Sequence, residues 1–167
     1  MEQLKSYSPE DIVYIDESGI DGFLHRPYAW APKGQKVIGE ISGKRYARES
    51  FVAGLCANAL LAPFCYQGTC NTALFNMWIQ DFLVPNLKPG QVVVMDNATF
   101  HKSETTRKLI EVAGCTLIFL PPYSPDLNPI ETFWANLKAK IRSLINNFST
   151  LQDAIDHAFQ LSIPQFI

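Results

Sequence analysis

Short apolar runs and periodic apolar stripes alternate along the chain, and turn-forming or capping residues separate them. In the first part, three runs are predicted to be strands: residues 12–16, 50–58 and 60–67. Short runs rich in β-branched and aromatic residues, bounded by turn signals, are typical of strands. The segment 23–40 mixes aromatic, proline and basic residues, and we expect an irregular hairpin there. The three strands predict an antiparallel meander.

After residue 70 the pattern changes to alternating helices and strands. Five apolar residues recur at helical spacing, namely Leu74, Phe75, Trp78, Ile79 and Phe82. Asn71 or Thr72 is a suitable cap for this helix, and Pro85 ends it. The β-branched run over residues 91–95 then predicts a strand suited to the centre of a sheet.

The remaining elements continue the alternation. A helix over residues 103–114 precedes a strand over residues 116–120. Two further helices are predicted over residues 129–146 and 151–160. A meander followed by strand–helix alternation predicts an α/β fold: a mixed five-stranded sheet with helices on both faces.

Composition places the chain among globular proteins of one domain. Its 167 residues are 47% apolar, enough for a substantial core and too many for a disordered chain. No apolar run approaches the roughly 20 residues of a membrane span, and no signal segment opens the chain. We therefore expect a bacterial cytoplasmic protein. Four cysteines without C-x-x-C or zinc-finger spacing indicate buried reduced thiols rather than a zinc site.

Charge is distributed unevenly, although the net charge is only −2. Residues 1–21 hold six acids against Lys5. Residues 22–48 hold one acid, Glu40, against six basic residues: Arg26, Lys33, Lys36, Lys44, Arg45 and Arg48. Two interpretations stay open, since such a segment either holds phosphates, with Lys33, Lys44 and Arg45 as candidates, or is a solvated hairpin.

Three carboxylates stand in chemically suggestive settings. Asp16 and Asp96 each close a short apolar run, and Glu131 opens a helical pattern. An acid at the end of a strand is held on rigid backbone at the edge of the sheet, where ligands collect. Three such acids from distant parts of a chain are what a divalent-metal phosphoryl-transfer site needs.

Each acid also has a structural alternative. Asp16 is able to cap a turn, and Asp96 is able to form an Asx turn before Asn97. Glu131 lies three residues after Asn128, with a proline between them, which is the pattern of a capping box. Glu17 is expected to point to the opposite face of the strand from Asp16.

The ordered set of motifs resembles the catalytic domain of DDE transposases of the mariner-like superfamily, most closely the bacterial insertion sequence 630 branch. Thirty-four residues separate Asp96 from Glu131, the spacing typical of that branch. The stretches that carry the resemblance are Tyr14 to Gly19, Trp30 to Gly34, Met95 to Ala98 with His101, and Leu120 to Glu131 followed by Phe133 and Trp134. They frame nearly the whole chain.

The resemblance implies a ribonuclease-H-like fold and metal-dependent DNA chemistry. The expected reaction is phosphodiester cleavage at transposon ends, followed by strand transfer into target DNA. Two Mg²⁺ ions are expected, with Mn²⁺ as a substitute. Asp16 would bridge both ions, Asp96 would bind one and Glu131 the other; Asp126 is a reserve ligand or a turn residue.

Other residues are candidates for DNA contact. Lys138 and Arg142 share the helix face of Glu131, where they either grip phosphates or form a solvated surface. Asn97 either orients Asp96 or touches the DNA backbone. His101 contacts DNA, orients a carboxylate or water, or caps its loop. Trp134 is expected in the core.

The resemblance also implies an assembly. Such enzymes act as homodimers or larger synaptic assemblies, here with DNA, in the bacterial cytoplasm at the nucleoid. We expect residues 1–167 to form a single catalytic domain without a helix-turn-helix module, which a separate subunit or upstream domain would supply. Two alternatives stay open: a non-transposing ribonuclease-H-like nuclease, and a catalytically silent transposase remnant or partner subunit.

Overall fold

A single mixed sheet organises the computed structural model, which describes residues 2–21, 48–122 and 124–162. Its strand order is β3-β2-β1-β4-β5. The strands are β1 (Ile12–Asp21), β2 (Arg48–Cys56), β3 (Ala59–Gln67), β4 (Val92–Met95) and β5 (Thr116–Phe119). The first three pair antiparallel, whereas β4 runs parallel to β1 and β5 parallel to β4. The predicted five-stranded mixed sheet is confirmed.

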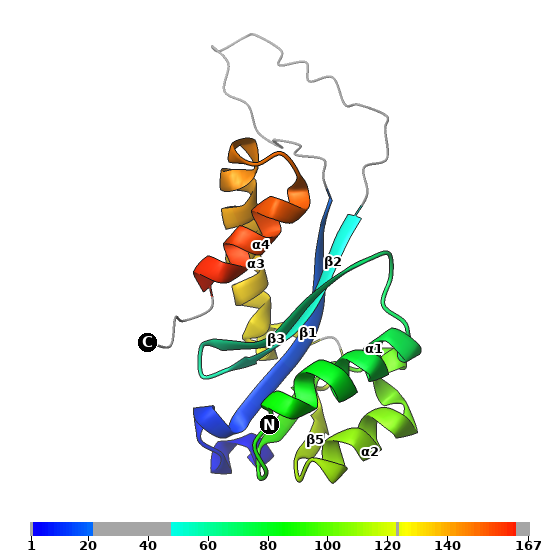
Figure 1. The fold of residues 1–167 in the computed structure, drawn as a ribbon. Helices are drawn as coiled ribbons and strands as arrows, with labels where there is room; N and C mark the ends of the chain where they lie inside the picture. The colour runs from blue at the N-terminus through cyan, green and yellow to red at the C-terminus, as the bar shows by residue number, and fades with distance from the viewer. Residues whose placement is uncertain (1, 22–47, 123, 163–167) are drawn as a thin grey trace, which may run out of the picture.

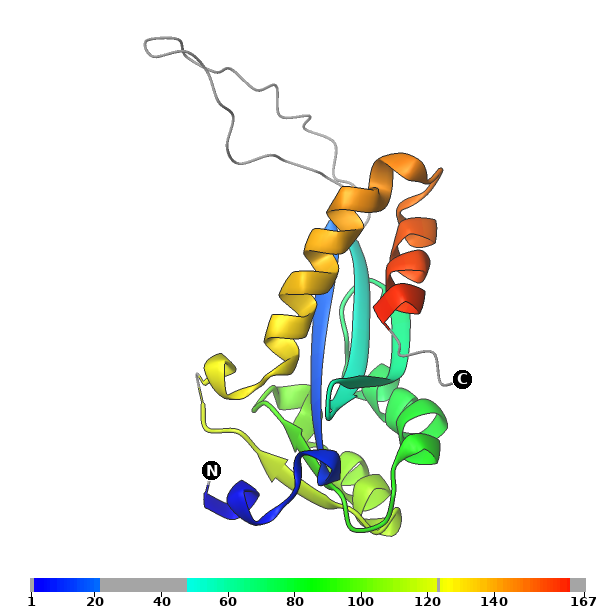
Figure 2. The same cartoon turned by 90° about the vertical axis from the view of Figure 1, so that its left-hand side faces the viewer.

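Helices cover both faces of the sheet, as Figures 1 and 2 show. On one face, α3 (Ile130–Leu144) and α4 (Leu151–Ser162) pack against β1, β2 and β3. On the other face, α1 (Thr72–Trp78) and α2 (Glu104–Val112) pack against β1, β2 and β4. Because side chains alternate along a strand, Val13 and Ile15 enter the α1 side and Ile20 enters the α3 side. Asp16 therefore faces α3, and Glu17 faces α1 and α2.

Trp134 anchors the α3 layer. Its side chain is completely buried, and its ring centroid lies 5.0 Å from that of Phe51 on β2. Ile130, Leu137 and Ile141 on the same helix are also buried. The predicted core position of Trp134 is confirmed, and its packing sets the height of α3 above the sheet.

Two elements differ from the sequence expectation. The first strand continues past Asp16 to Asp21, because β2 supplies antiparallel pairing as far as Arg48. The helix that begins at Thr72 changes after Trp78 into a π-helical turn, Ile79–Leu83. This wider turn rotates the apolar stripe, so Phe82 is 39% exposed and packs against Phe64 on β3.

The cysteines correct another expectation. All four are free thiols, but only Cys115 is buried, whereas Cys56, Cys65 and Cys70 are half-buried. The predicted hairpin at residues 23–40 lies outside the described residues. Within the described ranges, no helix has both the length and the apolar character that crossing a membrane requires.

Candidate active site

Asp16 occupies the point where β1 loses its parallel partner. The last β1–β4 pair is Tyr14 with Val94, and β4 ends at Met95. On its other side Asp16 stays paired with Ala53 of β2. Asp16 is thus held on rigid backbone within a strand rather than at its end, and its side chain is 8% exposed. Asp96 follows Met95 directly and leaves the sheet beside it.

Glu131 reaches the same region from the helical layer. It is the second residue of α3, next to the buried Ile130. The preceding Asn128 is buried and donates a hydrogen bond from Nδ2 to the main-chain oxygen of Ile15, at 3.4 Å. The helix begins one residue later than the predicted capping box requires, with Pro129 at the cap, and Oδ1 of Asn128 accepts a hydrogen bond from the main-chain N–H of Ile130 at 3.4 Å. The carboxylate of Glu131 lines a pocket instead of capping its own helix.

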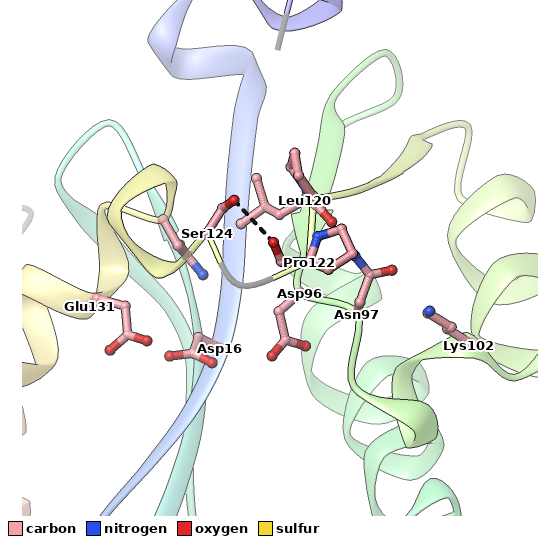
Figure 3. A pocket seen from close by; sticks show the side chains of 10 residues that line it. Asp16, Asp96, Asn97, Lys102, Leu120, Pro122, Ser124 and Glu131 are labelled. Atoms are coloured by element: carbon pink, nitrogen blue, oxygen red, sulfur yellow. Dashed lines mark hydrogen bonds between the residues drawn. The ribbon is translucent and has the colours of Figure 1, made fainter.

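The three acids line one pocket of about 520 Å³, together with Asn97, Lys102, Leu120, Pro121, Pro122, Ser124 and Asn128. Figure 3 shows the carboxylates in a row, with Asp16 between Glu131 and Asp96. They come from a strand, a helix and the loop after another strand. The fold therefore brings together the three residues that the sequence analysis selected.

Electrostatic repulsion in this row is strong. Burial, followed by the carboxylates of Glu131, Glu17 and Asp96, raises the pKa of Asp16 to about 8 from an ordinary value of 3.8. A buried carboxylate beside other carboxylates ionises at neutral pH only with difficulty unless a cation is near. The site is therefore built to hold positive charge.

Asp96 is held by two contacts on the same oxygen. Its Oδ1 accepts a hydrogen bond from the main-chain N–H of Ala98 at 2.9 Å, and lies 2.6 Å from Nδ1 of His101. The imidazole contact is close but poorly aligned for a hydrogen bond, so its attraction is mainly ionic. The contact with His101 lowers the pKa of Asp96. Both described contacts go to Oδ1, which leaves Oδ2 for a ligand in the pocket.

His101 corrects one of the predicted DNA contacts. Its side chain is completely buried, and Nε2 lies 2.8 Å from Oε1 of Glu17. Burial disfavours the charged ring, but the two carboxylate contacts outweigh it and raise the pKa of His101 to about 9. A ring enclosed in this way is not accessible to a DNA backbone. Of the predicted roles, orientation of a carboxylate fits the geometry.

The other predicted DNA contacts lie at different distances from the acids. Asn97 lines the pocket and donates from Nδ2 to the main-chain oxygen of Leu120, which joins the ends of β4 and β5. Lys138 is half-buried on α3, and its Nζ donates to Oγ of Ser18 on β1 at 3.1 Å. Arg142 is exposed one turn further along. Asp126 is also exposed and does not line the pocket.

Three of the predicted contacts, Lys33, Lys44 and Arg45, lie outside the described residues. The structure adds a residue that the sequence analysis missed, Lys102, which lines the acid pocket (Figure 3). It also lines an adjoining cavity of about 300 Å³ with Asn97, Ser103, Arg107, Leu117 and Phe119. The only signal in the sequence was its position directly after His101.

The donor set fits a hard divalent cation. The row consists of carboxylate oxygens, the ligands that Mg²⁺ and Mn²⁺ prefer. Within the described part of the chain, no three acid, histidine or cysteine side chains come close enough together to hold one ion between them. The row instead offers two neighbouring pairs of carboxylates, Glu131 with Asp16 and Asp16 with Asp96. A cation bound at either pair would take water molecules as its remaining ligands.

Comparison with known proteins gives a family match over most of the chain. The family model described as "DDE superfamily endonuclease" matches residues 11–153. The Tc3 transposable element transposase of Caenorhabditis elegans is 48% identical over 42 residues, which are 25% of this chain and 13% of that protein.

Solved structures share the fold. The Mos1 mariner paired-end complex with Mg superposes with a TM-score of 0.73 at 16% identity, over 99% of this chain and 52% of that chain. The corresponding complex with Mn gives a TM-score of 0.63 at 16% identity, over 96% and 56%. The catalytic core domain of BIV integrase gives 0.57 at 11% identity, over 95% and 86%. The chain thus spans about half the length of the Mos1 chains and most of the integrase core.

Proposed function

The chain belongs to the DDE superfamily endonuclease family, and on that premise we propose that it is the catalytic domain of a mariner-like DNA transposase. It would cleave a phosphodiester at a transposon end and join the freed 3′ end to target DNA. The observation that carries the proposal is the row of Asp16, Asp96 and Glu131 in one pocket. The spacing between Asp96 and Glu131 supports assignment to the insertion sequence 630 branch.

Each acid has a distinct part in this proposal. Asp16 stands between the other two and serves both pairs, Asp96 presents Oδ2, and Glu131 completes the row from α3. These residues would hold Mg²⁺, which would supply a lower pKa for the attacking water or 3′ hydroxyl and stabilisation of the leaving oxygen. The Mos1 complexes with Mg and with Mn support this choice of metal.

Basic residues on both sides of the row are proposed to hold the DNA backbone. Lys102 lies at the junction of the acid pocket and the adjoining cavity, and Arg107 lines that cavity. Among the described residues that line the adjoining cavity, none is acidic. A strand leaving the acids past Asn97 would therefore find two cations for its phosphates. Lys138 and Arg142 on α3 are the candidates on the opposite flank.

The assembly and the source of DNA-end recognition are part of the same proposal. The relatives named above include paired-end complexes of Mos1, which supports action as a homodimer or larger synaptic assembly on DNA. We propose that residues 1–167 act as one catalytic domain and that a separate subunit or upstream domain recognises the transposon end. The bacterial nucleoid as the place of action stays a prediction.

Cleavage and joining assays test the proposal. Purified protein is incubated with supercoiled plasmid and Mg²⁺ or Mn²⁺, and with a labelled oligonucleotide that carries a free 3′ hydroxyl. Wild type should nick the plasmid and attach the label to it, whereas Asp96→Asn and Glu131→Gln should do neither while keeping the wild-type circular dichroism spectrum. Nicking without joining would indicate a ribonuclease-H-like nuclease. No reaction with either metal would indicate a silent remnant or partner subunit.

A further inference from the structure

Glu17 is close to the acid pocket in sequence but not part of its lining. It follows Asp16 on β1, so its side chain points to the opposite face of the sheet. There it lines a separate cavity of about 240 Å³, beside Arg48 and Tyr66. Its carboxylate lies 2.8 Å from Nε2 of His101. Among the described contacts of Glu17, the one with the His101 ring leads on to Asp96.

The ring of His101 has little freedom to turn. Its centroid lies 4.4 Å from the ring of Phe75 and 4.4 Å from the ring of Phe100, and those two rings also contact each other at 5.8 Å. Each nitrogen is directed at a different carboxylate, Nε2 at Glu17 and Nδ1 at Asp96. A completely buried imidazole between two acids is a rigid link between a strand and a loop.

Asp96 is held less firmly by the sheet than Asp16 is. Asp16 is fixed on a strand paired on both sides nearby, whereas Asp96 follows the last residue of β4 and its side chain is 52% exposed. A half-exposed aspartate after a strand has several rotamers within reach. The imidazole and the N–H of Ala98 hold Oδ1, so that Oδ2 stays turned to the pocket.

We propose that Glu17 and His101 are positioning residues, with Glu17 fixing the His101 ring and the ring fixing the metal-binding carboxylate of Asp96. This role rests on the proposed function, because it supposes that Asp96 binds a cation. Groups that orient the ligands of a metal commonly contribute 10- to 100-fold to metal affinity. The geometry of the row would then depend on two residues that never touch the cation.

A matched pair of amide substitutions tests the link. The amide nitrogen of asparagine occupies the place of Nδ1, and that of glutamine occupies the place of Nε2. His101→Asn should keep the contact with Asp96 and bind Mn²⁺ nearly as wild type does. His101→Gln should keep the contact with Glu17, lose that with Asp96, and bind Mn²⁺ about 10-fold more weakly. Free Mn²⁺ is counted by electron paramagnetic resonance, and folding is checked by circular dichroism.

A second test of the link uses the Glu17→Gln substitution. It should weaken Mn²⁺ binding in the wild-type background and have no further effect in His101→Gln, because the link is already broken. Equal effects in both backgrounds, or wild-type Mn²⁺ affinity in both His101→Gln and Glu17→Gln, would overturn the positioning role. If wild type itself binds no Mn²⁺, the proposed function fails. The link is then judged from a crystal structure of Glu17→Gln, where an unmoved Asp96 side chain contradicts it.

Discussion

Asn128 donates a hydrogen bond from its Nδ2 to the main-chain oxygen of Ile15, across the buried boundary between α3 and β1. Ile15 directly precedes Asp16, and Asn128 stands three residues before Glu131. This hydrogen bond therefore fixes the start of α3, which carries Glu131, against β1, which carries Asp16. The relative position of the two carboxylates follows from it.

Loss of this bond should weaken both the fold and the site. Asn128→Ala should lower the free energy of unfolding by about 1 kcal/mol, the usual net contribution of an internal hydrogen bond. Plasmid nicking should fall by a larger factor than stability accounts for, because Glu131 is no longer held in place. Urea unfolding and the nicking rate measure the two effects. Asn146→Ala, at an exposed position after α3, is the control and should change neither.

The pKa of Asp16 predicts a pH-dependent stability. Burial and the neighbouring carboxylates raise this pKa from 3.8 to about 8. Between these values the folded protein keeps a proton that the unfolded chain has released. The free energy of unfolding of the metal-free protein should therefore fall as pH rises from 3.8 to about 8, and the contribution of Asp16 should level off above that pH. His101, whose pKa is raised to about 9, adds a decline in the same direction.

Asp16→Asn separates the two contributions. Urea unfolding at pH 5, 7 and 9 with a chelator should show a smaller decline for Asp16→Asn than for wild type. Addition of Mg²⁺ should reduce the decline of wild type, because the cation offsets the repulsion among the carboxylates. Parallel pH profiles of wild type and Asp16→Asn would show that Asp16 does not titrate in this range.

The adjoining basic cavity predicts a salt-dependent contribution to DNA binding. Lys102→Ala and Arg107→Ala should each weaken binding and reduce the slope of log affinity against log salt by about 1, the effect of one lost phosphate contact. Lys108→Ala is the matched control, since Lys108 follows Arg107 on α2, is paired with an acid four residues away as Arg107 is, and does not line the cavity. Fluorescence anisotropy at several salt concentrations gives the slopes. Equal slopes for all three variants would assign the effect to net charge alone.

Lys138 is expected to contact a DNA phosphate on the α3 side of the acid row. Its Nζ donates a hydrogen bond to Ser18 on β1, two residues from Asp16 along one face of the strand. Lys138→Ala should weaken DNA binding and reduce its salt dependence, whereas Ser18→Ala should keep the charge and alter binding less. The same anisotropy titrations compare the two variants. An unchanged salt slope in Lys138→Ala would remove it from the contacts.

Local patterns predicted most of the fold because they act over short distances. Stripes of apolar residues placed α3 and α4, and the buried run before Asp96 placed β4. The side chains of Asn71 and Ser103 accept hydrogen bonds at the starts of α1 and α2. The three acids could be selected because their order and surroundings form a recognisable motif.

Contacts between segments that are distant in sequence could not be predicted from local patterns. The length of β1 depends on pairing with β2, which no pattern near Asp16 reveals. The π-helical turn after Trp78 interrupts the regular apolar stripe that the sequence predicted, because it places the side chain of Phe82 at a different angle around the helix. His101 and Glu17 are far apart in sequence, and nothing in either segment indicates that one ring lies between two carboxylates.

The division of the acids between layers also has a consequence for biosynthesis. Asp16 is made early, but Glu131 lies on α3, which follows all five strands of the sheet in the chain. A growing chain on the ribosome therefore carries the first acid long before the last one exists. Such a chain lacks the complete row of acids, so the site exists only once α3 has been made and has packed against the sheet.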